Sequence, residues 1–268
     1  MTMTARRPII VGNWKMNLGG HQGLDQAQHL LEQVDASKAD RPQLVILPPV
    51  TVLARLQDLM SSTNKGVEYG AQDRSPHDDG AFTGDISASM LAELGCGYVL
   101  AGHSERRDHH GENDWVVNAK ITAALRHRLT PVLRVGEGVE VRRQVRQISH
   151  TLAQVDDALT AVSPDDVANM LIAYEPVWAI GTGHVATPED AQEVCAAIRA
   201  RIAEQYGSSV AERIRILYGG SVKSSTSAAI IEQADIDGAV SRRRQPRSRR
   251  ACSDLAVSPS SDPAEAHT

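Results

Sequence analysis

Short apolar runs recur along the chain and are separated by polar stretches. Almost every position within a run is apolar, whereas a half-buried strand would alternate apolar with polar positions. The pattern therefore predicts strands buried on both faces, as in a parallel sheet covered by helices. The eight predicted strands are residues 9–12, 44–47, 67–71, 98–101, 131–135, 171–174, 214–218 and 236–240.

The stretches between the strands have the apolar spacing of helices. Two helices are predicted to begin at Ser163-Pro164 and at Thr187-Pro188, where a capping residue is followed by a proline and acidic residues. Strands that alternate with helices indicate an α/β fold, and eight units favour a closed (β/α)8 barrel over an open doubly wound sheet. The predicted helices are residues 21–34, 51–61, 87–94, 114–128, 140–160, 188–205 and 224–233.

Composition limits the class of protein. The 268 residues, 41% of them hydrophobic, suffice for one barrel or two smaller domains. The three cysteines are scattered, which does not suggest a disulfide framework. The polar start of the chain lacks the apolar core of a signal peptide, and no apolar run approaches the roughly 18 residues that span a bilayer. We therefore expect a cytoplasmic protein with no membrane partner.

Charge differs between the body of the chain and its end. Residues 241–268 hold six arginines against three acidic residues, whereas residues 1–240 hold 22 lysines and arginines against 30 acidic residues. An acidic body argues against general nucleic-acid binding. We predict a barrel domain over residues 1–240 and a disordered tail, rich in Arg, Ser and Pro, over residues 241–268.

Polar and charged residues follow the ends of most predicted strands. In a barrel the reactive groups lie just beyond the carboxyl ends of the strands, so these residues should converge on one pocket. They are Asn13 and Lys15 after the first strand, Gln72 and Asp73 after the third, His103 and Glu105 after the fourth, Glu137 after the fifth, Glu175 after the sixth and Ser221 after the seventh.

Glu175 stands in the most informative segment, AYEPVWAIGTG. A proline follows it, and Gly181 and Gly183 close a short apolar loop. An exposed apolar loop is costly unless it folds onto something, so we interpret this one as a lid over the Glu175 carboxylate. The alternative is a loop packed permanently on a neighbour, with Glu175 in a surface ion pair.

His103, in the segment AGHSERR, directly precedes a predicted helical turn that begins at Ser104. The helix dipole disfavours a charged imidazole there, so His103 can stay neutral and donate a hydrogen bond. In the segment LYGGSV, Gly219, Gly220 and Ser221 precede a helix and can offer backbone N–H groups to an anion. A structural histidine and a simple turn are the alternatives.

Lys15 adds a fixed positive charge to the same pocket, and Asn13 adds an amide. A carboxylate base, a neutral imidazole, an ammonium and a phosphate site together suit proton transfer beside the carbonyl of a small phosphorylated molecule. Such a reaction needs neither a metal nor a cofactor, and the sequence displays no cluster of metal ligands.

The segments GNWKMN, GAFTGD, AGHSERR, AYEPVWAIGTG and LYGGSV closely resemble the triosephosphate isomerase family, in uninterrupted order over about residues 8–240. The resemblance implies a TIM barrel that interconverts dihydroxyacetone phosphate and D-glyceraldehyde 3-phosphate through an enediolate, a step of glycolysis and gluconeogenesis. The neutral histidine and the closing lid are known features of that family. Its long third loop matches residues 72–85 here and implies a homodimer.

The resemblance also assigns roles to residues. Glu175 would be the base that moves the proton, and His103 would be the electrophile that polarises the carbonyl. The remaining catalytic and substrate-binding positions would be Asn13 and Lys15, with Gly181 and Ser221 donating backbone N–H groups to the phosphate, and the supporting positions would be Glu105, Trp178, Gly219 and Gly220.

Position 134 departs from the family, which usually has a small cysteine there, close to the catalytic carboxylate. Arg134 would favour the ionised form of Glu175 and misdirect it if the two side chains pair. The alternative is a guanidinium that extends outward along the barrel mouth and leaves Glu175 alone.

The tail is the larger departure. The family continues after DIDGAV with a Gly-Gly phosphate loop and an amphipathic helix, whereas residues 241–268 carry no apolar stripe. We interpret the last β/α unit as incomplete and a reading-frame change in the gene as the origin, which resequencing the coding DNA would test. Two missing phosphate donors imply a loss of about 10²–10⁴ in affinity or rate. The missing helix implies a weakened, aggregation-prone barrel.

Two other functions compete with the isomerase. One is a different phosphate-binding barrel, or a barrel remnant without activity, which a coupled assay with glyceraldehyde 3-phosphate would separate from it. The other is a protein that binds nucleic acid or anionic surfaces through its Arg-rich tail, which deletion of residues 241–268 would test. The Glu175 and His103 segments together favour the isomerase.

Overall fold

The computed structural model describes residues 6–34, 41–63, 66–179, 186–220 and 224–242. Eight parallel strands pair in sequence order and the first pairs with the last, so the sheet closes into a barrel. All eight predicted strands and the (β/α)8 architecture are confirmed. The strands are β1 Ile9–Asn13, β2 Gln43–Leu47, β3 Val67–Ala71, β4 Tyr98–Ala101, β5 Thr130–Val135, β6 Leu171–Tyr174, β7 Arg215–Tyr218 and β8 Gly238–Arg242.

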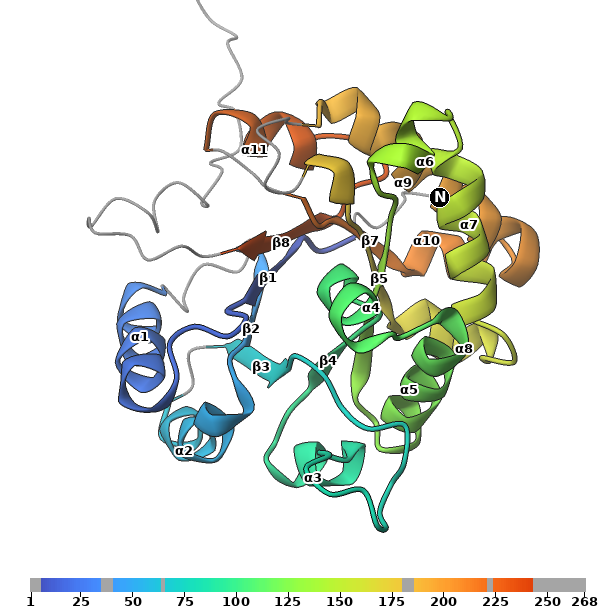
Figure 1. The fold of residues 1–268 in the computed structure, drawn as a ribbon. Helices are drawn as coiled ribbons and strands as arrows, with labels where there is room; N and C mark the ends of the chain where they lie inside the picture. The colour runs from blue at the N-terminus through green and yellow to red at the C-terminus, as the bar shows by residue number, and fades with distance from the viewer. Residues whose placement is uncertain (1–5, 35–40, 64–65, 180–185, 221–223, 243–268) are drawn as a thin grey trace, which may run out of the picture.

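Helices surround the barrel (Figure 1). The two predicted helix starts are confirmed, because the Ser163 side chain caps α8 and Thr187 forms a capping box with Asp190 at the start of α9. The helices are α1 Gly20–Gln33, α2 Val50–Ser61, α3 Ala88–Glu93, α4 Ser104–His110, α5 Asp114–Arg126, α6 Val139–Arg143, α7 Gln147–Ala158, α8 Pro164–Asn169, the 3₁₀ turn η1 Val177–Ala179, α9 Pro188–Tyr206, α10 Ser208–Arg213 and α11 Ser224–Ile231.

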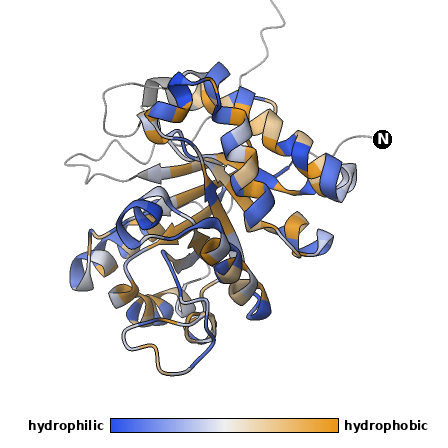
Figure 2. Cartoon of the chain, turned by 45° about the vertical axis from the view of Figure 1, so that its right-hand side comes forward, coloured by the Kyte–Doolittle hydropathy of each residue, from blue (hydrophilic) through white to orange (hydrophobic). Residues whose placement is uncertain are grey.

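Strand side chains alternate between the barrel interior and the layer beneath the helices. In β5, Val132 belongs to the inner cluster, whereas Leu133 and Val135 pack in the outer cluster under the helices. Colouring by hydropathy shows the consequence, since the strands are largely apolar while the helices carry a polar face as well (Figure 2). The alternation places the side chain of Arg134 on the inner side, at the carboxyl end of β5.

The prediction of a single helix over residues 140–160 is wrong. The chain forms α6 and α7 instead, with Val145 between them in the left-handed conformation, at φ 56°. A β-branched residue adopts this conformation rarely, so no sequence signal predicts the break. Breaking the helix turns α6 toward η1, where it contributes to the site described below.

The eighth strand closes the barrel despite the unusual sequence that follows it. Ser241 and Arg242 extend β8 and pair with Gly12 and Asn13 of β1. The predicted tail beyond Arg242 lies outside the described residues, so the incomplete last unit and the weakened barrel stay predictions. Among the helices that the structure describes, none is long and apolar enough to cross a membrane.

Candidate active site

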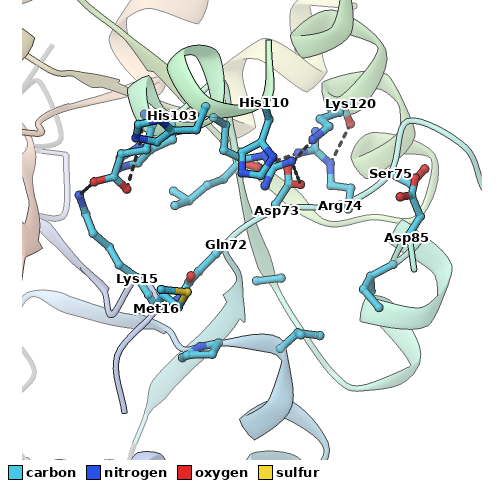
Figure 3. A pocket seen from close by; sticks show the side chains of 18 of the residues that line it. Lys15, Met16, Gln72, Asp73, Arg74, Ser75, Asp85, His103, His110 and Lys120 are labelled. Atoms are coloured by element: carbon cyan, nitrogen blue, oxygen red, sulfur yellow. Dashed lines mark hydrogen bonds and ion pairs between the residues drawn. The ribbon is translucent and has the colours of Figure 1, made fainter. Parts of the chain in front are cut away.

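The predicted site residues that the structure describes gather at the carboxyl ends of the strands. A narrow cavity of about 10 Å³ lies among them, and a larger one of about 690 Å³ adjoins it, with Asn13, Lys15 and His103 lining both. Figure 3 shows the larger cavity, with Lys15 reaching across toward the helix that begins beside His103. The narrow cavity is lined by Asn13, Lys15, His103, Arg134, Glu175, Gly219, Val240 and Ser241.

The end of β1 presents Lys15 in a strained backbone conformation. Its φ is 52°, and its backbone N–H donates to the Asn13 side-chain oxygen at 2.9 Å. Gln72 donates to the Lys15 carbonyl at 2.9 Å, and the Lys15 ammonium pairs with Glu105. Such strain costs about 1–3 kcal/mol and persists only where the surroundings impose it. The turn therefore aims the ammonium into the cavity instead of along the strand.

His103 is held in one tautomer. It caps the N-terminus of α4, and its Nδ1 accepts a hydrogen bond from the Glu105 backbone N–H at 3.2 Å. A neutral imidazole that accepts at one nitrogen carries its proton on the other, so Nε2 is the donor and faces Glu175. Burial, reinforced by the nearby Arg134 charge, lowers the pKa of His103 to about 4. The ring is therefore neutral at physiological pH.

Glu175 lies directly after β6 and is 2% exposed. Its Oε1 is 3.8 Å from His103 Nε2, and its Oε2 accepts from the Ser104 backbone N–H at 3.3 Å. Burial on its own would raise the pKa of Glu175, but the adjacent Arg134 and the other donors outweigh it and lower the pKa to about 2. The carboxylate is therefore ionised, as a proton acceptor must be.

Arg134 points inward and contacts Glu175. Its Nη2 lies 3.0 Å from Glu175 Oε1 and donates to the Gly219 carbonyl at 3.1 Å, and the side chain is buried. The alternative in which the guanidinium extends outward is thus wrong, because the strand alternation turns it into the barrel. The surface ion pair considered for Glu175 is wrong as well, since the pair is buried.

Gly219 and Gly220 allow close approach of neighbouring groups. A Cβ at Gly219 would lie 2.9 Å from the Tyr174 carbonyl and 3.0 Å from the Arg134 guanidinium carbon, and one at Gly220 would lie 2.9 Å from Pro176. Both positions therefore exclude a side chain. Gly181 and Ser221, the two predicted phosphate donors, lie outside the described residues.

The turn η1, which begins two residues after Glu175, is tied to the end of β5. The Trp178 backbone N–H donates to the Glu137 carbonyl at 3.2 Å, and Tyr174 donates to the Glu137 carboxylate at 3.0 Å. Arg142 lies over the Trp178 ring at 5.1 Å and pairs with Asp190 at the start of α9. Sequence reasoning placed Glu137 at the rim but missed its partner Arg142, because the predicted helix over residues 140–160 hid the turn between α6 and α7.

A buried charge network beside the larger cavity was also missed. Lys120 binds Asp73 at 2.5 Å and Glu112 at 2.6 Å, and Arg106 bridges the same two carboxylates. Arg74 donates to two backbone carbonyls beside them, and Figure 3 shows Arg74, Asp73 and Lys120 together. Lys120 sits within a helix whose spacing predicts only an apolar face, so no sequence signal marks it. The network fixes the start of the long third loop.

Within the described part of the chain, no group of three or more His, Cys, Asp or Glu residues could hold a metal ion. The charged side chains at the strand ends pair with one another instead, as Lys15 does with Glu105 and Arg134 with Glu175. The site can therefore supply a base, a neutral hydrogen-bond donor and a positive charge from its own side chains.

Comparison with known proteins places this arrangement in a family. The family model for triosephosphate isomerase matches residues 8–241. The chain is 50% identical to the triosephosphate isomerase of Streptomyces avermitilis over 238 residues, which is 89% of this chain and 92% of that protein. It is 44% identical to the triosephosphate isomerase of Mycobacterium tuberculosis over 234 residues, 87% of this chain and 90% of that protein.

The chain belongs to the triosephosphate isomerase family. Membership rests on nearly the whole barrel, because the matched residues run from just before β1 into β8. The buried Arg134 lies at the centre of the site.

Proposed function

We propose that the chain interconverts dihydroxyacetone phosphate and D-glyceraldehyde 3-phosphate. The observation that carries the proposal is the placement of an ionised carboxylate, Glu175, 3.8 Å from a neutral imidazole nitrogen that carries a proton, His103 Nε2. Two groups of this kind are what proton transfer beside a carbonyl requires. Family membership supports the same reaction.

The proposed reaction moves one proton between adjacent carbons. Glu175 takes a proton from the carbon next to the carbonyl, while His103 Nε2–H donates a hydrogen bond to the carbonyl oxygen as negative charge develops on it. Glu175 returns the proton to the neighbouring carbon of the enediolate, while the hydroxyl proton passes from the first oxygen to the former carbonyl oxygen beside His103 Nε2. The first oxygen becomes the new carbonyl, which gives the other triose phosphate. A neutral His103 suits this role, since an imidazolium would protonate the oxygen outright instead of sharing its proton.

Lys15 and Asn13 complete the proposed site. The Lys15 ammonium lines the same cavity as Glu175 and His103 and would stabilise the negative charge of substrate and enediolate. The Asn13 side chain holds the strained turn that presents Lys15. Glu105 pairs with Lys15 and donates through its backbone to His103, so it would support both groups without touching substrate.

A coupled assay with glyceraldehyde 3-phosphate tests the proposed function. The unaltered chain should turn the substrate over, and Glu175→Gln should lower kcat by at least about 10³-fold, because the amide cannot accept the proton. The matched control is Glu140→Gln, which changes an exposed glutamate of α6 and should leave kcat unchanged. Absence of turnover in the unaltered chain under all conditions would overturn the proposal.

We also propose a homodimer through residues 72–85. Phe82, stacked on His77 at 3.8 Å between ring centres, is 42% exposed, and Met16 at the edge of the 690 Å³ cavity is 97% exposed. A second copy that inserts this loop into the cavity would cover both side chains. Sedimentation of the unaltered chain should then show a dimer. Phe82→Asp should shift it toward the monomer, whereas a matched change at the exposed Trp115 should not.

A cytoplasmic location is part of the proposal. Cys96 and Cys195 are both buried with free thiols, which suits a reducing compartment. Modification with a thiol reagent under native conditions should be slow for both, and fast modification of the folded chain would argue against their protected environment.

A further inference from the structure

The side chain of Arg134 and the carboxylate of Glu175 form an ion pair at the centre of the proposed site. Their atoms lie 3.0 Å apart, and the two side chains are 2% and 3% exposed. At this burial, water screens the charges little, so the attraction between them is stronger than the same contact would have in solvent. The base of the proposed reaction is therefore engaged by a cation of the protein before any substrate arrives.

The geometry leaves Arg134 little freedom to move aside. Its Nη2 also donates to the Gly219 carbonyl at 3.1 Å, and the guanidinium carbon occupies the space that a side chain at Gly219 would need. The backbone on the opposite side is equally close, because the Gly219 N–H donates to the Tyr174 carbonyl at 2.6 Å. Only about 10 Å³ remains among these groups, roughly one water molecule.

The ion pair is poorly built as a stabilising device. Arg134 Nε and Nη1 are buried and have no hydrogen-bond partner among the described residues. Each such unpaired donor costs about 1–3 kcal/mol, and buried ion pairs are often replaced by apolar residues without loss of stability. A structural role therefore does not account for an arginine at this position.

We propose that Arg134 is a positioning residue that holds the Glu175 carboxylate against β5 and so restrains its action as the base. This inference rests on the proposed function. A base bound by a fixed cation must leave that cation as it takes up a proton, because the protonated carboxyl no longer forms an ion pair. The cost of separating the charges then falls on the step in which the proton moves.

The other groups around Glu175 do not cancel this restraint. His103, at the N-terminus of α4, is neutral and faces Oε1, and the Ser104 backbone N–H donates to Oε2. Lys15, two residues after β1, lines the same cavity and is paired with Glu105. All of them favour a negative Glu175 or leave it unchanged. Arg134, by contrast, brings a full positive charge into direct contact with the Glu175 carboxylate.

Replacement of Arg134 by residues with and without charge tests the inference by kinetics. We expect Arg134→Cys and Arg134→Met to raise kcat about 10-fold, with KM changed less than about 3-fold, because basicity and proton-transfer rate rise together. Arg134→Lys keeps a cation near Glu175 and should keep kcat low. The acid limb of the kcat/KM profile should move up by more than one pH unit in the Cys and Met variants. An unchanged or lower kcat with an unmoved limb would overturn the restraint.

A second measurement does not depend on turnover. Carbon-13 labelling of glutamate carboxyls allows the Glu175 signal to be followed by NMR, with its assignment from Glu175→Gln, or from Glu175→Asp if the former does not fold. The pH midpoint of the Glu175 carboxyl signal should rise by more than one pH unit in Arg134→Cys and stay low in Arg134→Lys. A midpoint that does not change when the guanidinium is removed would overturn the inference. A midpoint that moves in variants that all lack turnover would uphold the contact while the proposed function fails.

Discussion

Two glutamates at neighbouring strand ends, Glu175 after β6 and Glu137 after β5, have opposite pKa shifts although both are buried. Glu175 is 2% exposed and Glu137 is fully buried. Burial raises the pKa of Glu137, whereas the pKa of Glu175 is lowered. The difference lies in the nearest cation, since Arg134 touches Glu175 at 3.0 Å and Arg142 stays 3.8 Å from Glu137. Contact with a guanidinium, together with His103 and the Ser104 N–H, therefore outweighs burial at Glu175.

The two carboxyl groups also differ in the parts of the structure that they contact. Glu137 accepts from the Tyr174 hydroxyl, and its backbone accepts from Trp178, so it links β5 to the turn that follows Glu175. Glu175 instead pairs with Arg134 and accepts a hydrogen bond from the Ser104 N–H at the start of α4. Both contacts lie on the cavity side. One glutamate thus joins elements of the frame, and the other faces the space that a substrate would occupy. Removing the charge of each should have different consequences.

The largest difference is expected in stability. Glu175→Gln leaves Arg134 buried without its counter-ion, which should lower the free energy of unfolding by about 3–5 kcal/mol. Glu137→Gln keeps an oxygen for the Tyr174 hydroxyl and removes no close ion pair, so the loss should stay below about 1.5 kcal/mol. Urea unfolding at pH 7 measures both.

A double variant checks the cause of that difference. Arg134→Cys combined with Glu175→Gln removes both charges and should recover most of the stability lost in Glu175→Gln alone. Additive losses in the double variant would mean that the two side chains do not interact, and the contrast between the two glutamates would then need another explanation.

The second largest effect is a reversal in pH dependence. The pKa of Glu175 in the folded chain, about 2, lies below its ordinary value of 4.5. Its contribution to stability is therefore complete above about pH 4.5 and is lost as the pH falls toward 2. In Arg134→Cys, only His103 and the Ser104 N–H still oppose burial. We expect burial to prevail and raise the pKa above its ordinary value, so the contribution is present at low pH and lost as the pH rises. Unfolding measured between pH 3 and 7, as a difference between the two proteins, should show this change of sign.

The strand alternation explains how much of this site could be predicted from sequence. Asn13 and Glu175 follow inward-facing residues by two positions, Val11 and Ala173, so a count of two from the apolar pattern brings them to the same mouth. The same alternation turns Arg134 inward from Val132, but the runs are apolar almost throughout and do not show which positions face the interior, so the sequence left the outward alternative open. Strand boundaries and the convergence of strand ends are readable from the apolar runs, whereas the inward or outward side of each position follows from the closed barrel.

Other features had no local signal. The left-handed Val145 contradicts the preference of its residue type, and it lies in the turn between α6 and α7. The partners of Lys120 are Asp73 and Glu112. The fold brings them together, and their spacing along the chain does not predict the contact. Backbone conformations against propensity and ion pairs between distant segments depend on tertiary structure, so a single sequence does not reveal them.

A smaller effect on stability tests the contacts of Arg142, the cation beside Glu137. Arg142 pairs with Asp190 and lies over the Trp178 ring, with its side chain 20% exposed. Arg142→Met should lower the free energy of unfolding by about 1–2 kcal/mol. The matched control is Arg143→Met, since Arg143 is the next residue, is 70% exposed and pairs only with the exposed Glu140 among the described residues. That change should cost less than about 0.5 kcal/mol, and equal losses in the two variants would mean that Arg142 does not tie α6 to η1.

The smallest effect concerns the break that carries α6 toward Glu137. Val145 is 79% exposed and has a φ of 56°, a conformation that costs a residue with a Cβ about 1–2 kcal/mol. Val145→Gly relieves this strain but loosens the unfolded chain by about 0.5–1 kcal/mol, so a net gain of about 0.5–1 kcal/mol is expected. Val145→Ala keeps the Cβ and should gain less. Thermal unfolding of the three proteins measures the order, and kcat should not change, because the residue lies on the Glu137 side and away from Glu175. A loss of stability in Val145→Gly would mean that the left-handed turn holds the α6–α7 break through contacts of the valine side chain.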